Sequence, residues 1–148
     1  MIKPRGTLEQ RAAPSDKHHT RFRVRYAETD QMGVVYYANY LVWMEIGRAD
    51  LVRSRGLDYR DLEQAEGLFL SVLDANCHYL YPARYDQEII VETQVVNASS
   101  RTVEFAYQIR SAEPGRLLAQ GSTRHIWLNR EWRPVRLPEH YREMLRIG

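Results

Sequence analysis

The first regular pattern in the chain is an alternation of apolar and charged residues from Phe22 to Tyr26, which is typical of a half-buried strand. From Asn39 to Arg55, apolar residues instead recur at helical spacing, and Gly56 suits the position just past a helix end. Asn39 is the expected N-cap of this helix. Its apolar residues extend beyond one stripe of the surface, so we expect the helix to be largely enclosed.

The second half of the chain is typical of strands separated by turn signals. Expected strands cover residues 68–80, 88–96, 102–110 and 117–128, with a polar connector at 58–67 and a short closing helix at 138–146. This order favours an α+β fold in which one antiparallel sheet covers one long helix. The remaining face and the edges of such a sheet favour a homo-oligomer.

Composition narrows the class of protein without identifying a function. A chain of 148 residues with 44% hydrophobic and 27% charged residues suits one soluble domain, expected at 21–148 after a flexible polar tail at 1–20. The net charge of +2 is too small to suggest a nucleic-acid partner. No apolar stretch is long enough to span a membrane.

The same features favour a cytoplasmic location. Cys77 is the single cysteine, so no internal disulfide ties the fold to an oxidising compartment. The N-terminal residues lack the apolar core of a signal peptide.

The chemically most informative segment runs from Tyr26 to Tyr40. A strand-like run ends near Asp30, a tight segment follows around Gly33, and aromatic residues then precede the helix. Backbone N–H groups are unpaired at a helix N-terminus, where the dipole is positive. A carboxylate aimed there places a base beside an oxyanion site, which is the minimum equipment for hydrolysing an acyl compound.

Taken alone, Asp30 would also suit a residue that only caps backbone groups in a turn. The surrounding segment favours a catalytic role. Glu28, two residues earlier, is expected to be a solvated residue at a strand end.

The order of Asp30, Gly33-Val34-Val35, Tyr36-Tyr37 and Asn39-Tyr40 resembles the active-site segment of hotdog-fold acyl-CoA thioesterases of the 4-hydroxybenzoyl-CoA thioesterase-like family. The likeness extends in element order from Phe22 to Leu128. It implies a hotdog fold, an active site between subunits of a dimer or tetramer, and hydrolysis of an acyl-CoA to a free acid and CoA. No cofactor is expected, and no His or acidic pair has the spacing of metal ligands, so no metal is expected either.

The resemblance also implies roles for individual residues. Asp30 would act as general base or as nucleophile, and the backbone N–H of Tyr37 would stabilise the oxyanion. Relatives linked to the Tol–Pal system carry a histidine where this chain has Tyr37, so their histidine-assisted chemistry is not expected here. The residues expected to bind substrate are Gly33, Val34, Tyr36, Tyr40, Arg84, Ser100 and Arg101.

Several alternatives stay open. The tyrosines at 36, 37 and 40 suit either an acyl pocket or packing at the helix entry, whereas Trp43 and Met44 suit the core. Arg84 and Arg101 suit either CoA phosphates or an ordinary surface. The residues do not choose between aromatic and aliphatic acyl groups, or between CoA and acyl carrier protein thioesters.

Two other functions fit the same fold. A hotdog dehydratase or hydratase would need an active-site histidine, and none lies near Asp30 in the sequence. A non-catalytic acyl-CoA-binding protein would not need the carboxylate.

Overall fold

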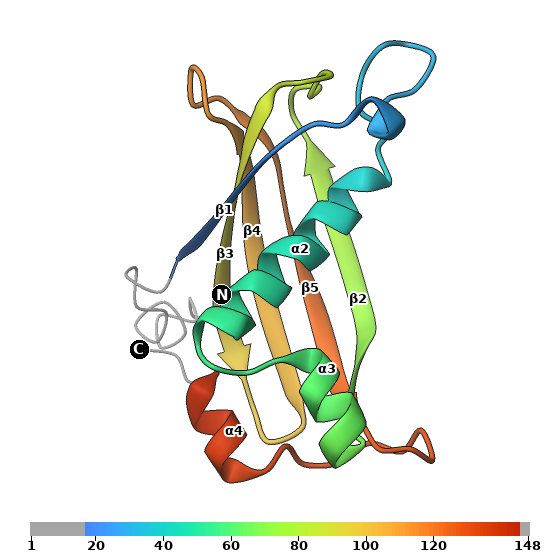
Figure 1. The fold of residues 1–148 in the computed structure, drawn as a ribbon, viewed down its shortest axis with the longest axis vertical. Coiled ribbons are helices and arrows are strands. Elements are labelled where there is room, and N and C mark those ends of the chain that lie inside the picture. Colours follow the sequence, from blue (N-terminus) through green and yellow to red (C-terminus); the bar gives the residue numbers. More distant parts are fainter. Residues whose placement is uncertain (1–16, 146–148) are drawn as a thin grey trace, which may run out of the picture.

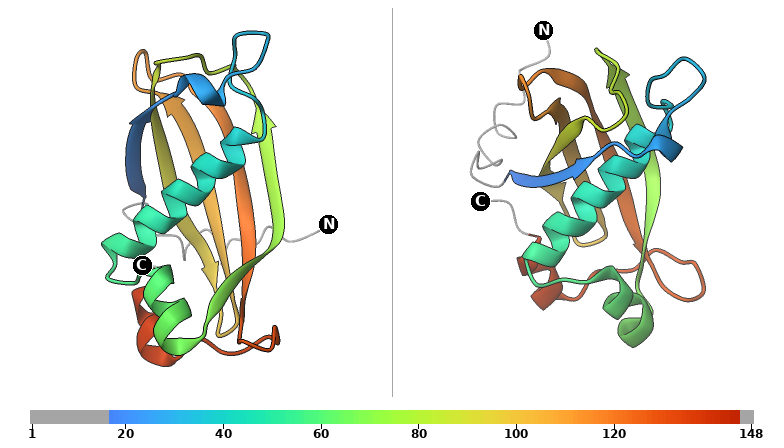
Figure 2. Two further views of the ribbon diagram at one scale, coloured as in Figure 1. Left: turned by 45° about the vertical axis from the view of Figure 1, so that its right-hand side comes forward. Right: turned by 45° about the horizontal axis from the view of Figure 1, so that its top comes forward.

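A five-stranded antiparallel sheet with one long helix across one face forms the protein (Figure 1), as seen in a computed structural model that describes residues 17–145. The strand order across the sheet is β1 (His18–Arg23), β3 (Glu88–Ala98), β4 (Thr102–Ser111), β5 (Leu117–Leu128) and β2 (Phe69–Tyr79). Helix α2 (Asn39–Ser54) lies against the sheet, as both turned views show (Figure 2). The shorter elements are η2 (Tyr26–Glu28), α3 (Tyr59–Asp61), η3 (Leu62–Glu66) and α4 (Glu139–Met144).

The predicted α+β fold is therefore confirmed, with strand bounds close to those expected. Two boundaries differ. The first strand lies earlier than predicted, because the chain turns into η2 at Tyr26. Residues 1–16 of the predicted tail lie outside the described residues, while His18–Thr20 belong to β1 rather than to a tail.

The expected polar connector at 58–67 is wrong, because this segment forms α3 and η3. Its amide groups are paired locally: the Asp58 side chain accepts from the N–H of Arg60, and Leu62 is buried beneath the turn. Gly67 then ends the helical segment with a φ of 65°. One buried leucine is too weak a periodic signal to predict a helix from sequence.

The core lies between α2 and the inner face of the sheet. In β3 and β4 every second residue is buried, including Val91, Thr93, Phe105 and Ile109. Trp43 and Met44 of α2 have no exposed surface, as predicted. The alternation fixes the register of both strands, because a one-residue slip would expose the whole apolar set.

The expectation that α2 would be enclosed is wrong for the single chain. Leu41, Val42 and Ile46 are 38%, 46% and 36% exposed. The neighbouring edge strand β2 also exposes Val72 and Leu73. The sheet covers only one side of the helix, so this apolar surface has no cover within residues 17–145. No helix described between residues 17 and 145 is long and apolar enough to cross a membrane.

Candidate active site

A tight loop presents Asp30 beside the start of α2. The Asp30 N–H donates to the Val34 carbonyl at 2.8 Å, and the Gly33 N–H donates to the Asp30 carbonyl at 3.0 Å. Gly33 adopts a φ of 80°, a left-handed conformation that glycine reaches without steric cost. The Asp30 Oδ1 accepts from the Met32 N–H at 2.8 Å. Across the described residues, no donor bonds its second oxygen, which leaves that atom available for chemistry.

The carboxylate of Glu28 is structural, and its expected solvation is wrong. Only 6% of the residue is exposed. Its side chain accepts from the Trp43 indole N–H at 2.8 Å and from the Arg25 N–H at 2.8 Å. Burial opposes ionisation, but these bonds and the Arg25 guanidinium outweigh it and lower the pKa of Glu28.

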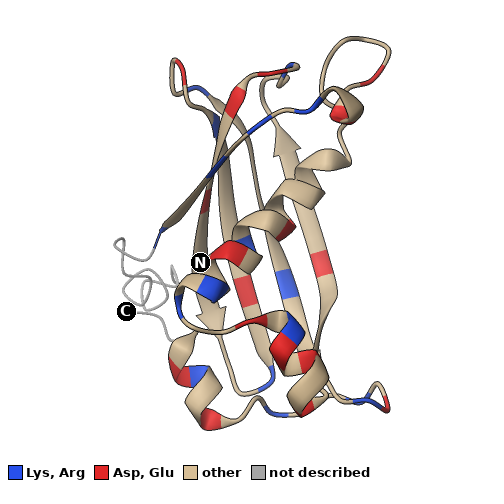
Figure 3. Ribbon diagram, in the orientation of Figure 1, with Lys and Arg blue, Asp and Glu red and all other residues tan. Residues whose placement is uncertain are grey.

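Helix α2 begins without a side-chain cap, and this leaves donors free at its N-terminus. The N-cap residue is Ala38, and Asn39, the predicted cap, instead donates through Nδ2 to the Glu28 carbonyl at 2.9 Å. In the described part of the chain, neither the Tyr37 N–H nor the Ala38 N–H has an acceptor, although the Tyr36 N–H donates to Glu28. The first turns of α2, through Met44, carry no charged side chain (Figure 3). Free amides at a positive dipole end suit an anion.

Aromatic rings frame the space between Asp30 and these amides. The Tyr37 and Tyr79 ring centroids lie 6.3 Å apart, and those of Tyr40 and Tyr79 lie 5.1 Å apart. The Tyr79 hydroxyl donates to the Tyr37 carbonyl at 3.0 Å. Burial, together with the neighbouring Cys77 thiol, raises the pKa of Tyr79 to about 12, so the phenol stays protonated at neutral pH and keeps this bond.

These groups enclose a cleft of about 300 Å³. The start of α2 is fixed against the segment after β2, because the Tyr40 hydroxyl accepts from the Ala83 N–H at 3.0 Å. The Val35 N–H also donates to the Ala83 carbonyl at 2.8 Å. The lining residues are Asp30, Met32, Val34, Val35, Tyr37, Tyr40, Tyr79, Leu80, Tyr81 and Pro82.

The structure brings together part of the predicted site. Val34, Tyr37 and Tyr40 line the cleft with Asp30, whereas Gly33 shapes the loop without lining it. The Tyr36 ring packs on that of Tyr37 at 4.7 Å, outside the cleft lining. Tyr40 serves both of the roles left open for it, because it is buried at the helix entry and lines the cleft.

The predicted substrate-binding residues outside this loop lie apart from one another. Arg84 lines a second pocket that adjoins the cleft. Ser100 and Arg101 lie at the β3–β4 turn, where their carbonyls accept from Leu137 and Trp127. This turn is beside the start of β2, while the cleft is beside its end, so one chain alone does not bring Arg101 to Asp30.

Sequence reasoning missed the wall formed by Tyr79, Leu80 and Tyr81. The pattern predicts that Tyr79 and Leu80 end a strand and that Tyr81 begins the break that follows it. The available signal was a run of large apolar side chains just before Pro82, near the free end of a strand. No histidine lines the cleft, and no group of three or more His, Cys, Asp or Glu side chains within 17–145 is placed to hold a metal ion.

Comparison with known proteins identifies the family. Residues 24–145 match the model of the thioesterase-like superfamily. YneP of Bacillus subtilis, named as a proposed acyl-CoA thioesterase, is 39% identical over 113 residues, covering 76% of this chain and 80% of YneP.

Similar solved structures support the same family assignment. A DHNA-CoA thioesterase from Staphylococcus aureus superposes with a TM-score of 0.80 at 33% identity, covering 86% of this chain and 85% of that one. A 4-hydroxybenzoyl CoA thioesterase gives a TM-score of 0.80 at 17% identity, covering 88% of this chain and 99% of that one, which supports the fold alone. The chain is therefore a hotdog-fold member of the thioesterase-like superfamily.

Proposed function

We propose that this protein hydrolyses acyl-CoA thioesters to a free carboxylic acid and CoA. The observation that carries the proposal is the pairing, across one aromatic cleft, of a carboxylate with a free oxygen and an uncapped helix N-terminus with free amides. Relatives named for the hydrolysis of CoA thioesters support the same reaction class.

The two sides of the cleft have different roles in the proposed reaction. The Tyr37 N–H donates to the thioester oxygen as negative charge develops on it, and the α2 dipole strengthens that bond. Asp30 either takes a proton from the attacking water or attacks the carbonyl carbon itself, forming an anhydride that water then hydrolyses. In both routes the C–S bond breaks and CoA leaves as a thiolate, which needs no strong acid to depart.

The deciding test is thiol release from a panel of aromatic, short aliphatic and long aliphatic acyl-CoAs. Asp30→Asn keeps the size of the side chain and its bond to Met32, but removes the base or nucleophile, so we expect kcat to fall about 100-fold or more. Asp61→Asn changes an exposed carboxylate outside the cleft and should retain the wild-type rate. Full activity in Asp30→Asn would contradict the assignment, and the preferred panel member would give the acyl class.

We further propose that the working enzyme is a homo-oligomer paired through β2. This strand ends the sheet, and its free edge together with α2 exposes Val72, Leu73, Val42 and Ile46. Antiparallel pairing of two β2 strands would continue the sheet and cover these residues. It would also place the Tyr79 end of one β2 beside the Phe69 end of the other, near the partner's β3–β4 turn. Arg101 could then reach a cleft from the neighbouring subunit.

Solution mass tests the pairing. Leu73→Lys places a charge on the exposed edge, so we expect the protein to shift from a multiple of its 17.5 kDa chain mass to the single-chain mass, with loss of thiol release. Ala65→Lys, on exposed η3, is the control for an added charge. Sedimentation equilibrium separates dimer from tetramer, and an unchanged assembly in Leu73→Lys would exclude this edge.

We also propose a cytoplasmic location, and we leave open whether CoA or acyl carrier protein carries the acyl group. A cytoplasmic location is consistent with the single cysteine, which leaves the chain without an internal disulfide. Acyl carrier protein thioesters belong in the same assay, because they present the same acyl thioester on a different carrier.

A further inference from the structure

Tyr79 lies at the end of β2 and bonds to the backbone at the start of α2. Its hydroxyl donates to the Tyr37 carbonyl at 3.0 Å. Among residues 17–145, the other donor to this carbonyl is the Tyr40 N–H, at the longer distance of 3.3 Å. The shorter of the two bonds therefore comes from the edge strand of the sheet and not from the helix itself.

The bond from Tyr79 fixes the peptide that joins Tyr37 to Ala38. In a trans peptide the C=O and the N–H point in opposite directions. The Tyr37 carbonyl is held toward the body of the helix, so the Ala38 N–H points out of the helix N-terminus. The preceding peptide is held in the same way, because the Tyr36 carbonyl accepts from the Asn39 N–H at 2.9 Å. Two neighbouring amides, of Tyr37 and Ala38, therefore leave the helix end together.

The Tyr79 ring is itself held in one orientation. It meets the Tyr40 ring edge-on, with centroids 5.1 Å apart and planes at 86°, and it meets the Tyr37 ring at 6.3 Å and 88°. Edge-to-face contacts of this kind stabilise a particular arrangement of the rings. The hydroxyl is therefore presented to the Tyr37 carbonyl from a fixed position.

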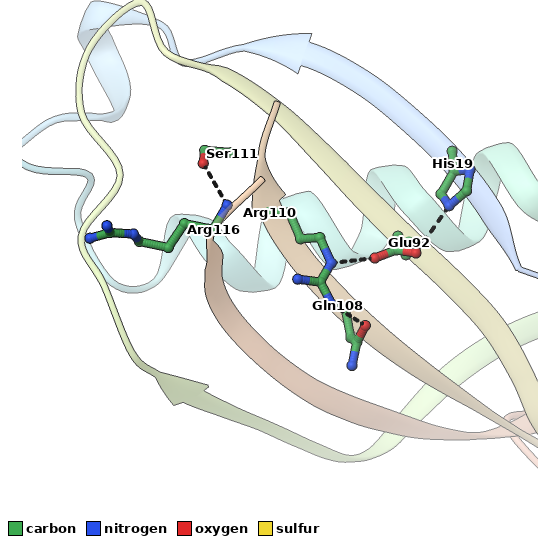
Figure 4. A network of polar contacts seen from close by, with 6 residues as sticks. All are labelled: His19, Glu92, Gln108, Arg110, Ser111 and Arg116. Atoms are coloured by element: carbon green, nitrogen blue, oxygen red, sulfur yellow. Dashed lines mark hydrogen bonds and ion pairs between the residues drawn. The ribbon is translucent and has the colours of Figure 1, made fainter. Parts of the chain in front are cut away.

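The end of β2 is anchored to the neighbouring strand β5. The N–H groups of Leu80 and Tyr81 both donate to the Leu118 carbonyl, at 2.8 and 3.0 Å. The hairpin that leads into β5 is closed by the Arg116 N–H, which donates to the buried Ser111 Oγ at 3.1 Å (Figure 4). The hydroxyl that holds the helix start is thus carried by well-bonded parts of the sheet.

Helix α2 gives the two amides little support of its own. Its N-cap residue, Ala38, has no side-chain oxygen, and the Asn39 side chain bonds to the Glu28 carbonyl instead. A helix end without a side-chain cap frays readily. A donor contributes most to catalysis when it is oriented before charge develops, because it then needs no reorganisation during the reaction. The bond from Tyr79 supplies that orientation.

We propose that Tyr79 is a positioning residue for thioester hydrolysis, which holds the Tyr37–Ala38 peptide so that the N–H groups of both residues face the developing oxyanion. The inference rests on the proposed function, to which it adds a second backbone donor and the side chain that orients it. Tyr79 stays bonded to the Tyr37 carbonyl and exchanges no proton with the substrate. Its contribution therefore belongs to the transition state and not to substrate binding.

The first test removes the hydroxyl and keeps the ring. Tyr79→Phe should lower kcat for the preferred acyl-CoA about five- to tenfold, the loss of one hydrogen bond, with KM within about twofold. Tyr79→p-aminophenylalanine returns an N–H donor to the same place and should restore most of kcat. Tyr141→Phe is the matched control, because Tyr141 donates to Glu66 at 3.1 Å outside the cleft lining, and it should keep the wild-type kcat.

Two inhibitors separate the transition state from the ground state. S-Trifluoroacetonyl-CoA carries an activated ketone that becomes tetrahedral when water or a carboxylate adds to it, whereas S-acetonyl-CoA has a similar shape and stays a ketone. Tyr79→Phe should raise the Ki of the first about as much as it lowers kcat, and should leave the Ki of the second within about twofold. The urea midpoint of Tyr79→Phe should match that of Tyr141→Phe, and its assembly should match that of the wild type.

Several results would overturn the proposal. Wild-type kcat in Tyr79→Phe would show that the helix start holds its own amides. A raised KM at unchanged kcat, or equal weakening of both inhibitors, would make Tyr79 a substrate contact only. A loss of kcat together with a lower urea midpoint or a smaller assembly would make it a structural residue. By contrast, a wild-type enzyme that releases no thiol from any acyl-CoA, or an Asp30→Asn variant with full rate, would contradict the proposed function itself.

Discussion

Glu28 joins the chain before the cleft to the helix after it. Its side chain binds the Trp43 indole inside the core, and its carbonyl accepts from the Tyr36 N–H and the Asn39 side chain, each at 2.9 Å. One residue therefore holds both ends of the loop that carries Asp30. Asp30 then needs no packing of its own, which keeps its second oxygen free for catalysis.

Replacing Glu28 with glutamine should destabilise the fold. The amide group would place an N–H₂ donor against the Arg25 and Trp43 donors, so a buried hydrogen bond is lost and donors oppose each other. We expect a fall of about 1–3 kcal/mol in the free energy of unfolding, measured by urea denaturation. Glu63→Gln, at an exposed position of η3, should be neutral. Equal stability of the two variants would show that the Glu28 bonds contribute little.

The sequence could identify the catalytic candidate but not the role of its neighbour. The order of Gly33, the aromatic pair and the helix start predicts a catalytic Asp30. The usual exposure of glutamate predicts a solvated Glu28, whereas its partner in the structure, Trp43, lies 15 residues later in the chain. Long-range pairing of this kind leaves no local pattern.

At the scale of the elements, the backbone of α2 lies directly against β3 at Gly47. A Cβ built there would lie 2.8 Å from Val91 Cγ1 and would also overlap Thr93, both of which are fully buried on β3. The absence of a side chain at this position lets the helix sit directly on the strand. The helix axis, and with it the Tyr37 amide, is positioned by this contact.

Gly47→Ala should therefore destabilise the protein even though alanine favours a helix. The gain in helix propensity is about 1 kcal/mol, whereas overpacking two β-branched residues costs about 1–3 kcal/mol and shifts the helix. We expect a net loss of stability and a lower kcat with Asp30 intact. Ala49→Gly, which lowers propensity without a clash, gives the comparison. A more stable Gly47→Ala variant would show that α2 can move away from β3 at little cost in free energy.

The strands were predictable and the surroundings of the helix were not. Alternation in residues 102–110 reports burial on one face directly, and the structure follows it. The apolar excess of α2 was equally visible, but a pattern shows only that a surface is apolar and not what covers it. Leu41, Val42 and Ile46 are exposed to solvent within residues 17–145, and nothing in their sequence pattern states what covers them.

At the scale of the whole molecule, stability should depend on pH through one buried histidine. His125 on β5 has no exposed surface, its Nε2 lies 2.8 Å from Thr123 Oγ1, and its Nδ1 has no partner in the described chain. Burial, together with the nearby Arg48 guanidinium, lowers the pKa of His125 from 6.5 to about 4. Protonating it would bury a positive charge near the half-buried Arg48 guanidinium, which the fold resists.

The sign of the effect follows from proton binding. Between pH 6.5 and about 4 the unfolded chain holds the histidine proton and the native chain does not, so the free energy of unfolding falls as pH falls through this window. Above it the ring is neutral in both states and contributes no pH dependence. The loss by pH 5 is about 2 kcal/mol. Glu28, Asp50 and Glu92, whose pKa values are lowered by their hydrogen bonds against the effect of burial, add a loss of the same sign at lower pH.

Urea unfolding between pH 7.5 and 4.5 measures how the free energy of unfolding depends on pH. The His125→Gln variant shows how much of this dependence comes from His125. Glutamine can still bond Thr123 but does not titrate, so the variant should lose some stability at pH 7.5 from imperfect packing and then change less than wild type down to pH 5. His140→Gln removes an exposed histidine and should keep the wild-type slope. Parallel slopes for wild type and His125→Gln would mean that the core admits the proton. Because α2 lies on the same core, acid should loosen the helix that presents the oxyanion donor, and activity should decline in the window where stability does.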